Sequence, residues 1–195
     1  MKILLIGGSG YVGSRIVAEA LRRGHDVNAP RSADLDASDE RSLAATIPGH
    51  DAIVSAFGSH TNPESILPVT RALLAAAKAT NVRLIAVGGA GSLEVAPGQR
   101  VMDLPDFSSE YKREAVAQAD ALELYRREPS VDWTVVSPAR DMVPGERTGN
   151  YRIGGDVLLV DSQGKSEVSA EDFAAAIIDE VEDRGHPRQR ISVAS

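Results

Sequence analysis

Cysteine is absent from this chain of 195 residues, and the absence narrows the chemistry available to it. Without thiols there is no disulfide, no cysteine nucleophile and no cysteine metal site, a composition that suits the cytoplasm. Histidine is scarce as well. His25, His50, His60 and His186 lack the spacing of metal ligands, so we expect no bound metal.

An excess of positive charge is also lacking. Lys and Arg number 21 against 28 Asp and Glu, and the resulting acidic surface argues against nucleic acid or an anionic membrane as a partner. The N-terminal apolar run is too short for a signal peptide or a membrane span. We therefore expect a cytoplasmic protein that acts on a small molecule. Its length suits a single domain covering residues 1–195, and its oligomeric state stays open.

The most informative feature that is present is a glycine-rich turn near the N-terminus. The aliphatic run Ile3 to Ile6 is typical of a strand buried on both faces, and apolar residues at helical spacing follow until Gly24. Between them lie Gly7, Gly10 and Gly13. Such glycines allow a tight turn, close approach of a pyrophosphate and close packing of helix on strand, so this turn, with Ser9, Tyr11 and Val12, predicts a dinucleotide site.

The spacing is G-x-x-G-x-x-G and not G-x-G-x-x-G, so an ordinary glycine-rich strand-to-helix turn remains an alternative. A P-loop is excluded, because no Gly-Lys-Ser/Thr closes the turn. The later Gly164-Lys165-Ser166 has Leu159 where the first glycine of that motif would stand.

The rest of the chain alternates between strand-like and helix-like segments. This alternation predicts an α/β fold of the Rossmann-like, doubly wound type: a mostly parallel sheet with helices on both faces, and a small C-terminal extension on the substrate side. The expected strands are 27–29, 51–57, 83–87, 132–137, 157–160 and 190–193, and the expected helices are 40–47, 68–79, 109–127 and one beginning after Ser169.

The second strand ends at Pro30-Arg31, where a Rossmann fold places the side chain that distinguishes NADP from NAD. A carboxylate there would bind the ribose 2′-hydroxyl, whereas Arg31 suits a 2′-phosphate, with Arg15 as a second candidate cation. We therefore expect NADP(H) to be preferred over NAD(H). The alternative is that both arginines are solvated surface charges.

Two long polar segments, 93–107 and 138–155, follow later strands of the sheet and predict a substrate cleft at one edge. The second segment carries Arg140, Arg147 and Arg152, which are candidates to receive an acidic substrate group. The small residues at the end of the strand 51–57, up to Gly58, would let the backbone pass beside the adenosine ribose.

Four motifs in order give the chain a family resemblance. They are the glycine turn, Asp36-Ala37-Ser38-Asp39, Gly88-Gly89-Ala90-Gly91-Ser92 and Asp132-Trp133-Thr134-Val135-Val136-Ser137-Pro138. The chain resembles the atypical short-chain dehydrogenase/reductases, in the NAD(P)H-binding, NmrA-like branch that includes NADH-flavin reductases and biliverdin-IXβ reductases. The resemblance implies that Gly7, Gly10, Tyr11 and Val12 line the pyrophosphate and that Asp36 and Ala37 hold the adenine. It also implies that Ser55, Ala56 and Phe57 follow the ribose and that Gly88, Gly89 and Ala90 lie near the nicotinamide.

The chain departs from the wider superfamily in lacking the catalytic Tyr-x-x-x-Lys. Four residues after Tyr11, Tyr111, Tyr125 and Tyr151 stand Arg15, Ala115, Pro129 and Gly155. The remaining candidates for catalysis are Tyr111 and Lys112 as proton donor and cation, and Ser92 as a hydrogen-bond donor. A surface pair at a helix start, and a serine that only caps a turn, are the competing interpretations.

The sequence therefore favours an NAD(P)H-dependent reductase that transfers hydride to a small conjugated or cyclic acceptor, possible without a tyrosine acid when the acceptor is a flavin. A non-catalytic, NmrA-like NADP(H) sensor is the alternative, supported by the missing tyrosine and lysine. An NAD(P)-dependent epimerase or isomerase is weaker, because it needs the absent acid–base pair.

Overall fold

A seven-stranded sheet forms the centre of the computed structural model, which describes residues 1–195. The strand order is β2-β1-β3-β4-β7-β11-β9, and only β9 runs antiparallel to its neighbour. The strands are β1 (Lys2–Ile6), β2 (Asp26–Asn28), β3 (Ala52–Ser55), β4 (Arg83–Val87), β7 (Trp133–Pro138), β9 (Arg152–Gly154) and β11 (Gln189–Ala194). The predicted doubly wound α/β fold is confirmed.

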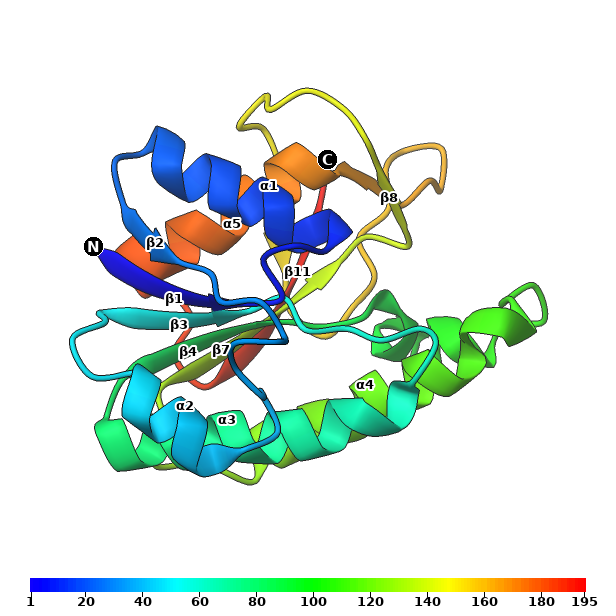
Figure 1. Cartoon of the computed structure of the whole chain (residues 1–195). Helices are drawn as coiled ribbons and strands as arrows, with labels where there is room; N and C mark the ends of the chain where they lie inside the picture. The colour runs from blue at the N-terminus through cyan, green and yellow to red at the C-terminus, as the bar shows by residue number, and fades with distance from the viewer.

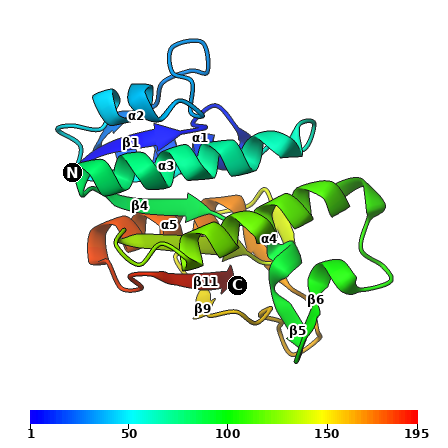
Figure 2. The ribbon, with the colours of Figure 1, turned by 90° about the horizontal axis from the view of Figure 1, so that it is seen from below.

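Helices cover both faces of this sheet, as Figure 1 shows. They are α1 (Tyr11–Arg22), α2 (Glu40–Thr46), α3 (Ile66–Thr80), α4 (Lys112–Arg126) and α5 (Ala170–Asp183). The pair α1 and α5 lies on one face, and α2, α3 and α4 lie on the other. Seen from below in Figure 2, α3 and α4 lie side by side across the sheet.

Alternation of side chains along β1 explains why both faces can be covered. Ile3 and Leu5 enter the core beneath α1 and α5, while Leu4 and Ile6 enter the core against α2 and α3, and all are at most 4% exposed. An uninterrupted aliphatic strand is therefore required at this position of a parallel sheet. The side chain of Ser169 accepts a hydrogen bond from the N–H of Asp172 and begins α5, as its sequence predicts.

The segment between β2 and α2 is unusually short. Residues 29–39 form turns, and no helix or strand stands there. The side chain of Asp39 caps α2 by accepting a hydrogen bond from the N–H of Arg41 at 3.0 Å. The chain therefore passes from the second strand directly to the helix that precedes β3.

The two long polar segments are more structured than their sequence indicates. Residues 93–103 contain the hairpin of β5 (Glu94–Ala96) and β6 (Gln99–Arg100), followed by a short 3-10 turn. In the second segment β8 (Asp141–Val143) pairs in parallel with β10 (Glu167–Ser169), which leads into α5. Both segments therefore contain regular strands where their sequence predicts polar loops.

The predicted strand at 157–160 is wrong. This segment makes one isolated bridge, between Val157 and Glu94, and Val157 and Val160 are 56% and 42% exposed. An apolar run becomes a strand only where a neighbour can pair along its length. Here the place beside β11 is taken by β9, so the run crosses the surface.

None of the helices is both long enough and apolar enough to cross a membrane.

Candidate functional site

The glycine turn has a backbone geometry that only glycine can supply. Gly7 has a positive φ of 83°, and a Cβ atom on it would lie 2.7 Å from the carbonyl oxygen of Ala56. A Cβ atom on Gly13 would lie 2.1 Å from the carbonyl oxygen of Gly7. The turn therefore packs directly against the start of α1 on one side and the residues after β3 on the other.

The first turn of α1 presents unpaired hydrogen-bond donors. The N–H groups of Tyr11, Val12 and Gly13 have no hydrogen-bond acceptor in the protein, and no side chain caps the helix. A Cβ atom on Gly10 would approach only the carbonyl oxygen of Gly7, at 3.3 Å, so this residue is open on its other side. Unpaired amides at the positive end of a helix dipole fit the pyrophosphate of a dinucleotide.

A cleft of about 900 Å³ extends from this turn along the carboxyl ends of the parallel strands. Its lining comes from the starts of α1 and α4, the segments after β3, β4 and β7, the small β8/β10 sheet and the loop before α4. Of the residues that the sequence predicts for the site, the cleft brings together Gly10, Tyr11, Val12, Ala56, Phe57, Gly58, Gly88, Gly89, Ala90 and Tyr111. Gly7, Ser9, Gly13, Arg31, Asp36, Ala37, Ser55, Ser92 and Lys112 are not among its lining residues.

Several residues outside the cleft support its wall. Gly7 and Gly13 shape the turn from within, and Ser55 is 4% exposed at the end of β3. Its hydroxyl accepts a hydrogen bond from the N–H of Phe57 at 3.4 Å, which holds the segment that lines the cleft.

Arg31 and Asp36 lie in the exposed turns after β2, near the glycine turn. A Cβ atom on Gly8 would lie 2.9 Å from the Cβ of Ala29, so the end of β2 touches the turn. The side chain of Arg31 is exposed and makes no hydrogen bond, leaving its guanidinium free for a ligand. The carboxylate of Asp36 accepts hydrogen bonds from the N–H and hydroxyl of Ser38, and these lower its pKa.

Arg15, the second candidate cation, is already engaged. Its guanidinium lies 4.1 Å from the ring centroid of Tyr11 and 3.4 Å from the carboxylate of Glu171. These contacts hold it beside α1 and α5 and leave Arg31 as the freer of the two cations.

Tyr111 lines the cleft, but the other two catalytic candidates are directed elsewhere. Tyr111 is 51% exposed, and its hydroxyl makes no hydrogen bond within the protein. The Lys112 ammonium donates instead to the carbonyl of Met102 and lies 3.8 Å from Asp103. The hydroxyl of Ser92 accepts a hydrogen bond from Arg190 at 2.8 Å, away from the cleft. Of the three catalytic candidates, only Tyr111 therefore lines the same cleft as the glycine turn.

The same face of α4 adds residues that the sequence analysis missed. Glu114, Ala115 and Gln118 also line the cleft, and with Tyr111 they follow helical spacing. The Glu114 carboxylate lies 3.5 Å from Nδ1 of His60, whose ring centroid lies 4.8 Å from that of Tyr111. The spacing of 111, 114, 115 and 118 was a usable signal, because it marks one face of a helix.

An ion pair joins two segments of the lining. Nη2 of Arg140, just after β7, lies 2.7 Å from the carboxylate of Asp106 in the loop before α4. The hydrogen bond from Arg140 lowers the pKa of Asp106. The other two arginines of the long loop lie elsewhere: Arg147 bonds Glu19, and Arg152 bonds the carbonyls of Val160 and Ser195.

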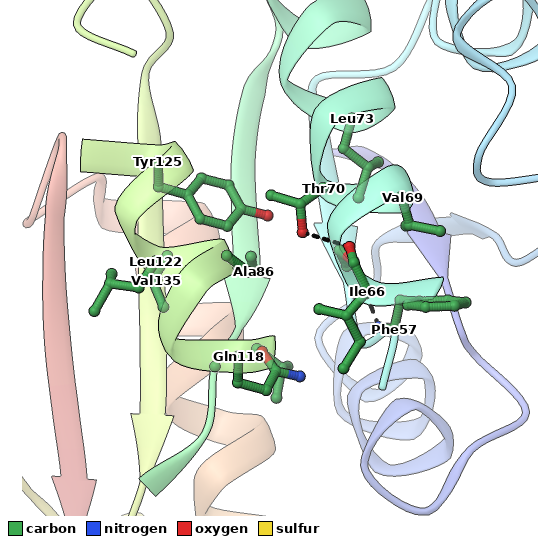
Figure 3. A pocket seen from close by; sticks show the side chains of 14 residues that line it. Phe57, Ile66, Val69, Thr70, Leu73, Ala86, Gln118, Leu122, Tyr125 and Val135 are labelled. Carbon is green, nitrogen blue, oxygen red and sulfur yellow. Dashed lines mark hydrogen bonds between the residues drawn. The ribbon is translucent and has the colours of Figure 1, made fainter. Parts of the chain in front are cut away.

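Behind the cleft lies a small, mostly apolar cavity of about 20 Å³ between α3, α4 and the sheet (Figure 3). The ring of Tyr125 extends from α4 toward α3, and burial raises its pKa. The other walls of the cavity include Phe57, Gly88 and Gln118, which also line the cleft. Next to Gly88 lies Ser137, which is 1% exposed and whose hydroxyl has no hydrogen-bond partner. If Gly88 carried a Cβ atom, that atom would lie 3.1 Å from this hydroxyl.

Comparisons with known proteins agree with this geometry. A family described as NAD(P)H-binding matches residues 7–184. The YwnB protein of Bacillus subtilis is 40% identical over 210 residues, which cover 100% of this chain and 99% of YwnB.

Two solved structures are similar over nearly their whole length. A Streptococcus pneumoniae protein whose name proposes an NADH-flavin reductase is 35% identical, with a TM-score of 0.90, over 100% of this chain and 99% of that one. A Bacteroides thetaiotaomicron protein whose name proposes an epimerase is 38% identical, with a TM-score of 0.91, over 99% of this chain and 96% of that one.

Proposed function

Since this chain belongs to the NAD(P)H-binding family matched by residues 7–184, we propose that it is a reductase that transfers hydride from NADPH to a small conjugated or cyclic acceptor such as a flavin. The observation that carries the proposal is one continuous cleft that joins the glycine turn to the carboxyl ends of the strands and continues past Gly88 to Ala90 to Phe107, Tyr111 and Met142. The reductase name of the Streptococcus pneumoniae protein supports it.

Bound NAD(P)H supplies a hydride, which with one proton from water converts an oxidised flavin to dihydroflavin and leaves NAD(P)⁺. The protein contributes binding and orientation. The amides of Tyr11, Val12 and Gly13 would hold the pyrophosphate, and Ala56 and Phe57 would follow the ribose. Gly88 to Ala90 have no side chain larger than a methyl group, so the nicotinamide ring can lie against their backbone.

We assign the proton donor, where the acceptor needs one, to Tyr111. Tyr111 lines the cleft and its hydroxyl makes no hydrogen bond within the protein, whereas flavins and other strongly oxidising acceptors can take their proton from water. Lys112 and Ser92 are not part of this proposal, because their polar atoms are bonded to Met102 and Arg190.

The proposal includes a preference for NADPH over NADH, carried by Arg31. The guanidinium is exposed, without an ion pair, in the turn that follows β2, and a 2′-phosphate is the ligand for which a free arginine is suited. A cytoplasmic location is part of the same proposal and rests on the absence of cysteine.

The direct test is whether the purified protein consumes NADPH in the presence of riboflavin, FMN, quinones or enones. The loss of NADPH absorbance measures this consumption. Turnover with at least one acceptor is expected. With enones, Tyr111→Phe should lower kcat by about 100-fold while leaving the Kd for NADPH unchanged. With flavins as acceptors, Tyr111→Phe should lower kcat far less than it does with enones.

A non-catalytic NADP(H) sensor is the second candidate, and the missing Tyr-x-x-x-Lys favours it. A sensor would bind NADPH tightly, show no turnover with any acceptor and change the shape of its polar loops on binding. Tight NADPH binding with a complete lack of oxidation across the acceptor panel would replace the reductase by the sensor. An epimerase remains the weaker candidate, because neither Lys112 nor Ser92 pairs with Tyr111 as an acid–base couple.

A further inference from the structure

The charged side chains that line the cleft are nearly all acidic. Asp106, Glu114, Asp141 and Glu167 line it together with Arg140, which is the only lysine or arginine of the lining. We propose that the acceptor is an uncharged ring system, such as the isoalloxazine of riboflavin or a quinone, and that phosphorylated flavins and carboxylated tetrapyrroles are poor substrates. The inference rests on the proposed reductase function and names the substrate class of that site.

The single cation is not free to receive an anionic substrate. Arg140 lies 2.7 Å from Asp106, and this pair is electrically neutral. Lys165, which lies outside the cleft lining, neutralises Glu167 at 2.7 Å. Asp141 forms no ion pair, and the only partner of Glu114 is His60, at 3.5 Å. The charges left facing the cleft are therefore the carboxylates of Asp141 and Glu114.

Other basic groups near the cleft do not reverse this balance. Lys112 lies 5.8 Å from the ring centroid of Phe107, but its ammonium is bonded to Met102 and is close to Asp103. His60 faces both Glu114 and Glu110. With a dinucleotide bound at the glycine turn, an anionic acceptor would also meet the negative charge of the pyrophosphate in the same cleft.

The uncharged part of the wall fits a flat ring. Phe107 and Tyr111 supply aromatic surface from the loop before α4 and the start of that helix. Pro138 and Met142 supply apolar surface from the segment after β7 and from β8. An aromatic and apolar surface with unpaired carboxylates nearby favours binding of neutral conjugated molecules and repels phosphate or carboxylate groups.

The test compares riboflavin with FMN, which differ by one phosphate group. Quenching of flavin fluorescence by the protein saturated with NADP⁺ gives each Kd without turnover, and kcat/KM with NADPH gives the catalytic preference. At low ionic strength we expect riboflavin to bind at least about 10-fold more tightly than FMN, and the ratio to fall toward one as added salt screens the carboxylates.

Substitutions that remove the unpaired charges should reduce this preference. Asp141→Asn and Glu114→Gln should each tighten FMN binding several-fold and so lower the ratio of the FMN Kd to the riboflavin Kd. Asp120→Asn is the matched control, because Asp120 is exposed on the same helix as Glu114 and lies outside the cleft. It should leave the ratio unchanged.

The possible failures are separable. FMN binding as tightly as riboflavin at low salt, or a ratio that neither substitution changes, overturns the charge argument and leaves the reductase function in place. No binding and no turnover of any flavin or quinone overturns both proposals.

Discussion

Arg140 and Asp106 form an ion pair of 2.7 Å between residues that are 34 positions apart in the sequence. The pair connects the end of β7 with the loop before α4, and both residues line the cleft. The hydrogen bond from Arg140 lowers the pKa of Asp106, as expected for a carboxylate paired with a guanidinium. The pair therefore links two walls of the cleft and leaves Arg140 without a free positive charge.

Replacing Asp106 by Asn should alter ligand selection more than stability. The Asp106 side chain is 65% exposed, so loss of the pair should leave the urea midpoint of unfolding nearly unchanged. The released Arg140 should make FMN binding several-fold tighter. Glu123→Gln removes a comparable exposed contact, with Arg126 at 2.8 Å outside the cleft, and should leave FMN binding unchanged. Equal FMN affinities in both variants would contradict a role for Arg140 in selection.

Alanine substitutions at Gly10 and Gly13 should separate binding from folding. A Cβ on Gly13 would overlap the Gly7 carbonyl oxygen at 2.1 Å, so Gly13→Ala should cost more than about 3 kcal/mol of stability. A Cβ on Gly10 meets only that oxygen, at 3.3 Å, and otherwise faces the cleft. Gly10→Ala should keep the wild-type Tm and weaken NADPH binding at least about 10-fold, about 1.4 kcal/mol. Unchanged NADPH affinity in a folded Gly10→Ala protein would mean that the pyrophosphate binds elsewhere.

The fold could be predicted where the signal is local. The run at 83–87 ends at the glycine pair Gly88-Gly89 and becomes β4 with the same bounds. The run at 157–160 has a similar composition, yet the place beside β11 that could pair it is occupied by β9. Strand formation depends on a neighbour, and the sequence of the run does not name that neighbour.

In the candidate site, too, the part built from consecutive residues could be predicted and the part built from distant segments could not. The glycine turn is a continuous motif, so its geometry follows from a few consecutive residues. The cleft wall is assembled from Asp106, Glu114 and Arg140, whose proximity depends on the packing of α4 against the sheet and on the pairing of β8 with β10. Lys112 follows Tyr111 directly in the sequence, but successive residues of a helix point in different directions, and it bonds Met102 instead.

Arg31→Gln should abolish the preference for NADPH. We expect the wild-type protein to bind NADPH more tightly than NADH, and the variant to lose about 10-fold or more in NADPH affinity with NADH affinity unchanged, because only the 2′-phosphate contact is removed. Fluorescence titration of both nucleotides measures this. Arg71→Gln, at an exposed position on α3 that makes no ion pair, is the control for loss of one positive charge. Equal affinity for the two nucleotides in the wild-type protein would refute the role of Arg31.

Glu19 on α1 should make folding stability depend on acid pH. Its side chain is 5% exposed and accepts hydrogen bonds from Arg22 at 2.8 Å, Arg23 at 2.7 Å and Arg147 at 2.9 Å. These hydrogen bonds lower the pKa of Glu19 from 4.5 to about 2, and the bond from Arg22 contributes most. Because the pKa of Glu19 is lower in the folded protein than in the unfolded chain, its ionised form stabilises the fold. This stabilisation is complete above about pH 4.5 and disappears as the pH falls toward 2. It amounts to about 3 kcal/mol at neutral pH.

Glu19→Gln tests this linkage. At pH 7 the variant should be less stable than the wild-type protein by about 3 kcal/mol or more, because three guanidinium groups lose their shared carboxylate. This difference in stability should shrink as the pH approaches 2. Urea unfolding at a series of pH values measures it. Glu146→Gln is the control, since Glu146 is exposed in the same loop as Arg147 and forms no ion pair. A Glu19→Gln protein whose stability falls between pH 5 and pH 3 as steeply as that of the wild type would show that other carboxylates carry the acid sensitivity.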